Sequence, residues 1–197
     1  IYRYSYSANY YLYDRETEDL QPLDEEHQPQ TLAEYSPDGN HVSYIYQNNI
    51  YVKNLKTGIV TALTSDGEKN AIINGTTDWV YEEEFAFIKA YDWSPDSKYI
   101  AYLKFDERQV KEFSMTFYNE LYPDSYDFKY PKAGEENSKV SVHISSLTGK
   151  EKQEVFLGQY EYIPRMEWSP SVNQLILQSM NRHQSSLKYH LVDLQGD

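Results

Sequence analysis

Three consecutive glutamates are the clearest candidate for chemistry in this sequence. They end the run Asp78-Trp79-Val80-Tyr81-Glu82-Glu83-Glu84. In a strand, Glu83 and Glu84 would point to opposite faces, whereas in a helical turn they lie about 100° apart and both carboxylates can reach one point. A primary ammonium has three donors and no acceptor, so two carboxylates can take two of its donors in charge-assisted hydrogen bonds. The pattern alone also fits a solvated acidic turn, and both interpretations stay open.

The residues around the glutamates predict a short helix. Asp78 is a good N-cap residue, and Glu82 falls just beyond the first turn, where the helix dipole favours an acid. No histidine is close in sequence to complete a transition-metal shell, so we expect no metal site here. The chain has no cysteine, which excludes disulfides, thiolate metal ligands and cysteine nucleophiles. We predict no cofactor.

The charge of the chain limits its partners. The formal net charge is −13, and no patch of lysine and arginine is visible that would bind phosphates, so we expect no nucleic-acid partner. An acidic surface favours cationic ligands, although a merely solvated surface explains the charge equally simply.

A repeated tripeptide indicates the elements that must position the glutamates. An aromatic residue precedes Ser-Pro three times, in Tyr35-Ser36-Pro37, Trp93-Ser94-Pro95 and Trp168-Ser169-Pro170. Proline ends a strand, and the turn formers after it lead into an alternating apolar run, which is typical of a second strand. These runs are His41–Tyr46, Tyr99–Leu103 and Gln174–Gln178.

Further strands follow each of these runs. We predict a hairpin turn at Asn48-Asn49. The predicted third strands are Ile50–Leu55, Val140–Ile144 and Leu187–Val192, and two fourth strands are Ile59–Leu63 and Gln153–Leu157. Each third strand ends at a turn with glycine, namely Thr57-Gly58, Thr148-Gly149 and Gln195-Gly196. Tyr10 to Tyr13 read as the last strands of an earlier blade.

The repeats predict an all-β fold: a single partial β-propeller domain over residues 1–197, with about three four-stranded antiparallel blades. A propeller typically has four to eight blades, so this piece cannot close. The repeats are further apart than the ~40–45 residues of a simple propeller repeat, so each contains an insertion. The insertions are Ala71 to Phe85 and Asp106 to Asn137, and long loops of this kind are where function is expected.

Several stretches resemble the propeller of dipeptidyl peptidase IV and its close relatives. The run from Asp78 to Glu84 is the most specific of them. The others are Tyr2-Arg3-Tyr4-Ser5-Tyr6-Ser7-Ala8 followed by Tyr13-Asp14, Asn49–Lys53, Ile73-Asn74-Gly75 and Tyr130-Pro131-Lys132-Ala133-Gly134. The resemblance spans about Arg3 to Asn137 and is weaker afterwards.

The resemblance implies a specific role for three residues. In that family an eight-bladed propeller caps an α/β-hydrolase domain, and the enzyme removes X-Pro or X-Ala dipeptides from free peptide N-termini. The residues aligned with Glu83 and Glu84 bind the α-ammonium of the substrate. The arginine aligned with Arg3 helps to hold the glutamate pair and contacts a substrate carbonyl. Peptides with a free N-terminus are therefore the implied substrates.

The chain itself lacks the catalytic machinery of a serine peptidase. No Gly-x-Ser-x-Gly nucleophile elbow occurs in it, and its five histidines show no recognisable triad order. We therefore expect the triad in a C-terminal α/β-hydrolase domain of the same chain, and we expect this fragment to be inactive alone.

Partners and location follow from the resemblance only. An extended propeller arm contributes to dimerisation in that family, so a homodimer is one expectation. The insertion from Asp106 to Asn137 is either that arm or an ordered surface loop. We expect an exported parent, periplasmic or at the cell surface.

Three alternatives are weighed against this reading. A propeller that binds protein partners needs the same blade pattern but has no use for the glutamate run. An inactive homologue is not separable from the peptidase within this sequence. Substrates of prolyl-oligopeptidase-type endopeptidases need no ammonium anchor, so the glutamates argue against that class.

Overall fold

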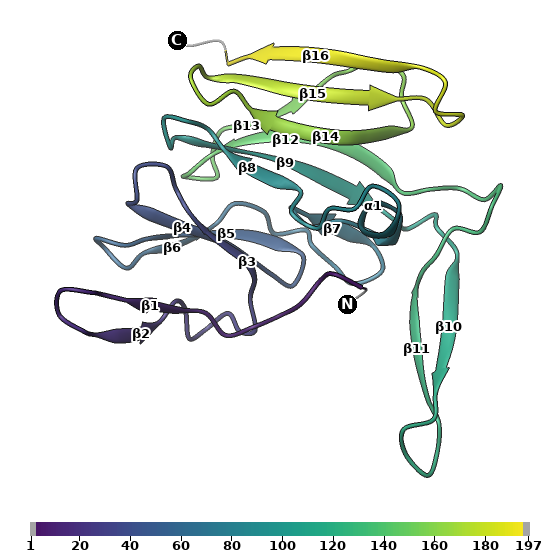
Figure 1. Ribbon diagram of the computed structural model, residues 1–197, viewed down its shortest axis with the longest axis horizontal. Coiled ribbons are helices and arrows are strands. Elements are labelled where there is room, and N and C mark those ends of the chain that lie inside the picture. Colours follow the sequence, from purple (N-terminus) through teal and green to yellow (C-terminus); the bar gives the residue numbers. More distant parts are fainter. Residues whose placement is uncertain (1–2, 195–197) are drawn as a thin grey trace.

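A computed structural model describes residues 3–194, and the chain there folds almost entirely into β-strands. The sheets follow one another across the molecule in sequence order, from the N-terminal hairpin to the C-terminal sheet (Figure 1). Two features of the sequence analysis, Tyr2 and the Gln195-Gly196 turn, lie outside the described residues. Among the residues that are described, no helix is long and apolar enough to cross a membrane.

The first complete blade confirms the predicted four-stranded unit. It has the order β3-β4-β5-β6 and is antiparallel throughout. Its strands are β3 (Thr31–Tyr35), β4 (His41–Tyr46), β5 (Asn49–Asn54) and β6 (Val60–Ala62). A two-stranded sheet of β1 (Tyr11–Tyr13) and β2 (Leu20–Pro22) precedes it.

The predicted turn at Asn48-Asn49 is displaced by one residue. Tyr46 pairs with Asn49, so the two turn residues are Gln47 and Asn48, with φ of 46° and 59°. A tight two-residue hairpin needs positive φ at its central residues, and this matches the twist of the flanking strands. Asn49 is instead a buried strand residue whose Oδ1 accepts hydrogen bonds from Thr64 and from the backbone of Gly67.

The second blade uses part of the first insertion. Its sheet has the order β13-β12-β9, and both β7 and β8 pair with the remaining edge of β9. Its strands are β7 (Ile72–Asn74), β8 (Tyr91–Trp93), β9 (Tyr99–Asp106), β12 (Lys139–Ser146) and β13 (Lys152–Val155). The innermost strand is therefore split in two, and the segment between its halves is free to leave the sheet and form α1 (Trp79–Glu83).

The third blade and the second insertion complete the fold. The third blade has three strands, β14 (Tyr162–Trp168), β15 (Gln174–Met180) and β16 (Leu187–Asp193). The second insertion is an antiparallel hairpin of β10 (Glu112–Phe117) and β11 (Asp124–Lys129), which projects away from the blades (Figure 1). We call this hairpin the arm.

The hydrophobic core lies between neighbouring blades. One buried cluster joins side chains of the first blade, such as Ile50, to side chains of the second, such as Ile100. A larger cluster joins the second and third blades, with Val142 and Leu175 among its members. Each blade therefore buries its faces against its neighbours, as the propeller architecture requires.

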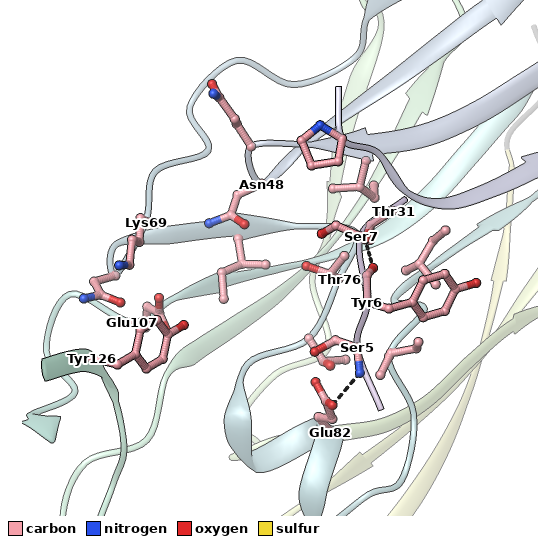
Figure 2. Close-up of a pocket in the computed structure, with 18 residues that line it drawn as sticks. Ser5, Tyr6, Ser7, Thr31, Asn48, Lys69, Thr76, Glu82, Glu107 and Tyr126 are labelled. Carbon is pink, nitrogen blue, oxygen red and sulfur yellow. Dashed lines mark hydrogen bonds between the residues drawn. The ribbon is translucent and has the colours of Figure 1, made fainter. Parts of the chain in front are cut away.

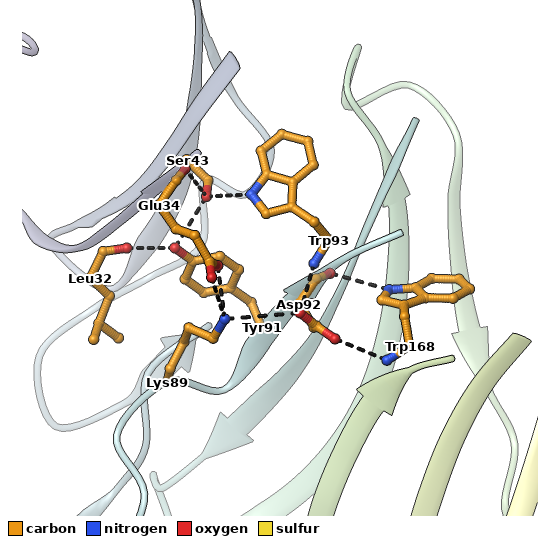
Figure 3. Close-up of polar contacts among 8 residues, drawn as sticks. All are labelled: Leu32, Glu34, Ser43, Lys89, Tyr91, Asp92, Trp93 and Trp168. Atoms are coloured by element: carbon orange, nitrogen blue, oxygen red, sulfur yellow. Dashed lines mark hydrogen bonds and ion pairs between the residues drawn. The ribbon is translucent and has the colours of Figure 1, made fainter. Parts of the chain in front are cut away.

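Polar side chains also cross between blades (Figure 3). The Trp93 indole N–H of β8 donates to Ser43 Oγ in the first blade at 2.9 Å. Asp92 accepts the backbone N–H of Trp168 in the third blade at 2.9 Å, and the Trp168 indole donates to the Asp92 carbonyl at 3.2 Å. Lys89 binds Glu34 of β3 at 2.8 Å. These contacts fix the second blade against both of its neighbours and so set the position of α1.

Candidate functional site

The helix that carries the glutamates begins where the sequence predicts. Asp78 is its N-cap, and one carboxylate oxygen accepts the Tyr81 backbone N–H at 3.0 Å. The other accepts the Ser138 hydroxyl at 2.6 Å. Asp78 is buried, and burial raises the pKa of its carboxyl. The cap therefore satisfies an otherwise orphaned helix donor and ties α1 to the strand that follows the arm.

One side chain fixes α1 to the body of the propeller. Tyr81 is buried against Phe85, Phe87 and Phe105, with ring centroids 4.8–5.7 Å apart. Its hydroxyl oxygen accepts the backbone N–H of Ile163 in β14 at 2.8 Å. The helix is thus held by an aromatic cluster and by a hydrogen bond to the third blade.

The three glutamates have three different environments. Glu82 is only 1% exposed, and its Oε1 accepts the backbone N–H groups of Tyr4 at 2.5 Å and Ser5 at 2.8 Å. Glu83 has a side chain that is 14% exposed, and its Oε2 lies 3.3 Å from Nη2 of Arg3. Glu84 is the C-cap residue and is exposed. Within residues 3–194 its carboxylate has no ion pair.

The structure thus brings together two of the three predicted residues and places the third beside them. Arg3 contacts Glu83, and Glu84 follows Glu83 directly at the end of the helix. Sequence reasoning missed the contact of Glu82 with the N-terminal segment. Its spacing offered a signal, because Glu82 lies four residues after the buried cap Asp78 and so on the same helix face.

A polar cavity of about 310 Å³ lies next to this site (Figure 2). The N-terminal segment from Ser5 to Ser7 crosses it on one side, and Glu82 lines it from α1. Glu107, just after β9, also lines the cavity and is only 3% exposed. Burial, reinforced by the nearby charge of Asp78, raises the pKa of Glu107 to about 7. Sequence reasoning did not single out this residue.

The described part of the chain holds no cluster of three or more histidine, cysteine, aspartate or glutamate side chains arranged for a metal ion. The glutamates of α1 instead face a guanidinium and backbone N–H groups. This is an arrangement for nitrogen cations and donors, in which each carboxylate accepts hydrogen bonds.

Comparison with known proteins identifies the family. The family described as the dipeptidyl peptidase IV (DPP IV) N-terminal region matches residues 1–197. The chain belongs to this family. Its architecture is accordingly part of the N-terminal β-propeller of such proteins, and the all-β, partial-propeller prediction is confirmed.

A solved structure supports the assignment throughout the chain. The crystal structure of Porphyromonas gingivalis dipeptidyl peptidase 4 matches with a TM-score of 0.93 and 37% identity, over 98% of this chain and 28% of that one. The eight-blade count of the whole propeller stays a prediction, because this chain contains only part of it.

Among curated proteins, the human protein named "Prolyl endopeptidase FAP" is 38% identical over 150 residues, covering 75% of this chain and 20% of that protein. "Probable dipeptidyl-aminopeptidase B" of Talaromyces marneffei is 33% identical over 214 residues, covering 98% of this chain and 24% of that protein. The chain therefore spans between a fifth and a quarter of the length of these relatives.

Proposed function

We propose that this chain is the N-terminus-recognition region of a serine dipeptidyl aminopeptidase. Glu83 and Glu84 bind the α-ammonium of a peptide substrate, and Arg3 holds Glu83 and contacts a substrate carbonyl. The observation that carries this proposal is the ion pair between Arg3 and Glu83, made from distant parts of the chain beside an exposed second glutamate. Membership of the family supports the same assignment.

The electrostatics of the site suit this role. Two adjacent carboxylates repel each other, and a guanidinium beside one of them offsets that repulsion in the empty site. An arriving ammonium then finds acceptors already in place. Fixing the ammonium also fixes how many residues of the substrate reach the nucleophile, which accounts for release of dipeptides.

The remaining parts of the proposal concern the complete protein. The serine nucleophile and its triad belong to a C-terminal α/β-hydrolase domain of the same polypeptide, so this region alone is inactive. The arm, with its exposed Phe117, Tyr118, Leu121 and Tyr122, is the surface through which two copies form a homodimer. The parent acts outside the cytoplasm, in the periplasm or at the cell surface.

Endopeptidase activity is the second candidate. It is favoured by the similarity to the human protein named as a prolyl endopeptidase. An endopeptidase must accept substrates without a free N-terminus, so the two candidates differ in their need for the ammonium.

The test compares a Gly-Pro chromogenic amide with its N-acetylated form, using the complete protein. Cleavage of only the free-amine substrate supports the dipeptidyl aminopeptidase. Cleavage of both at similar rates favours the endopeptidase, and cleavage of neither favours an inactive homologue or a binding propeller.

A variant then assigns the residues. Glu83→Gln should lower kcat/KM for the free-amine substrate by orders of magnitude. Glu151→Gln, an exposed acid on the turn between β12 and β13, is the matched control and should leave it unchanged.

A further inference from the structure

We propose that Glu82 is a positioning residue that anchors the N-terminal segment so that Arg3 lies over Glu83. The segment from Arg3 to Ala8 is called the strap below. This inference rests on the proposed function, because it concerns how the ammonium site is assembled. It assigns to the first glutamate of the run a task different from that of the two that follow it.

The contacts of Glu82 are with backbone, and they fall next to Arg3. Its Oε1 accepts the N–H groups of Tyr4 and Ser5, the two residues directly after Arg3. Within residues 3–194 Glu82 has no cationic partner, and its side chain is almost fully buried. A buried carboxylate is costly unless it is hydrogen-bonded, so the two N–H donors of the strap are what this burial requires.

Packing does not explain the position of the strap. Tyr4 and Tyr6 are both about half exposed, and the cavity of about 310 Å³ lies under Ser5 to Ser7 (Figure 2). A segment that crosses a cavity gains little from apolar burial and depends on its hydrogen bonds. The structure gives the strap such bonds at three points along its length.

The anchor points lie at increasing distance from Arg3. The strap residue Ala8 exchanges two backbone hydrogen bonds with Gln30, each 2.9 Å long. The Thr31 hydroxyl donates to the carbonyl of Tyr6. Glu82 supplies the remaining anchor, and it is the one nearest to Arg3. Losing the two outer anchors would leave the arginine end held, whereas losing Glu82 would leave it free.

Glu82 also shares a helical turn with Glu83. The acid that anchors the strap and the acid that receives its arginine are therefore parts of one short rigid element, α1, which Tyr81 fixes to the third blade. Movement of α1 carries both contacts together, so the geometry between Arg3 and the glutamate pair is preserved. This is a device for preorganisation, which reduces the entropy lost when a ligand binds.

A double-mutant cycle in the complete protein tests this role. The variants are Glu82→Ala, Arg3→Ala and the combination, measured as kcat/KM on a free-amine Gly-Pro amide. A misplaced binding group costs about 10- to 100-fold, and we expect that loss from Glu82→Ala. If Glu82 acts through Arg3, the double variant should be no worse than Arg3→Ala alone. Glu82→Gln keeps an acceptor oxygen and should retain most of the activity.

The outcomes separate this inference from the proposed function. Wild-type kcat/KM in both Arg3→Ala and Glu83→Gln would sink the ammonium site itself. Impairment of those two variants with a wild-type Glu82→Ala, or losses that multiply in the double variant, would overturn the positioning role alone.

Hydrogen exchange gives a readout that is independent of activity. The amides of Tyr4 and Ser5 should exchange slowly in the wild type and in Glu82→Gln, and faster in Glu82→Ala. The amide of Ala8, bonded to Gln30, is the internal control and should be unaffected. Equally fast exchange of Tyr4 and Ser5 in the wild type and in Glu82→Ala would overturn the proposal.

Discussion

Arg3 and Glu83 form an ion pair whose two members are unequally embedded in the protein. Nη2 of Arg3 lies 3.3 Å from Oε2 of Glu83, but the arginine side chain is 68% exposed and the glutamate side chain only 14%. The fold fixes the acid through α1, while the arginine reaches it from the solvent side. Such exposed pairs contribute about 0–1 kcal/mol to stability, so the value of this one must lie in binding.

Arg3→Ala should therefore separate activity from stability. We expect kcat/KM for free-amine substrates to fall, because Glu83 loses the charge that holds it, while the melting temperature of the complete protein stays nearly constant. Steady-state kinetics and calorimetry measure the two effects. Arg15→Ala, in the exposed turn between β1 and β2, is the control. A large drop in melting temperature with unchanged kcat/KM would contradict the prediction.

Tyr81→Phe should destabilise the propeller without changing the shape of its core. The substitution removes the hydroxyl that accepts the backbone N–H of Ile163, and a buried unsatisfied donor costs about 1–3 kcal/mol. Thermal or urea unfolding measures the loss. Tyr118→Phe is the matched control, since Tyr118 is 80% exposed on the arm. Equal stability of the two variants would show that this hydrogen bond does not hold α1 in place.

The sequence predicts the local features of this fold well, because they depend on local rules. Alternating apolar runs place β4 at its observed bounds and β9, β15 and β16 within a few residues of theirs. Asp78 marks the start of α1 because an aspartate side chain can accept a hydrogen bond from an N–H of the first helical turn. The hairpin between β4 and β5 is predicted, but only the φ angles decide which two of its residues turn.

Non-local contacts are what the sequence cannot supply. Nothing local indicates that Ile72–Asn74 returns to the edge of β9, since a three-residue strand has no readable period. The closeness of Arg3 and Glu83 came from resemblance to a family, not from spacing. The anchoring contact of Glu82 with Tyr4 and Ser5 was missed for the same reason, because its partners are backbone groups that have no sequence signature.

Gly75→Ala should cost more stability than Gly39→Ala, although both glycines have a left-handed φ, 78° and 70° respectively. A Cβ at Gly39 meets nothing within 4 Å, so that variant reports only backbone strain of about 1–2 kcal/mol. A Cβ at Gly75 would lie 2.8 Å from Cδ1 of Ile45 and 3.0 Å from Cγ1 of Ile50, both buried. Overpacking adds about 1–3 kcal/mol. Equal melting temperatures for the two variants would show that the core yields at this point.

Glu107→Gln should change the pH dependence of stability. The pKa of Glu107 is raised to about 7 by burial and by the charges of Asp78 and Asp106, and Lys129 only partly opposes this. The folded protein therefore holds this proton more tightly than the unfolded chain, whose glutamate has an ordinary pKa near 4.5. Stability linked to Glu107 is fully present below the unfolded pKa, falls as the pH rises toward 7, and is constant above that.

The size and the test follow from this shift. The linked loss is on the order of 2–3 kcal/mol between pH 4.5 and 8. Because glutamine does not titrate, the stability of Glu107→Gln relative to the wild type should increase by that amount between pH 5 and pH 8. Urea unfolding at the two pH values measures the difference, with Glu151→Gln as the exposed control. A difference that stays constant with pH would mean that Glu107 is already ionised at pH 5 in the folded protein, and that the cavity solvates its charge as well as water does.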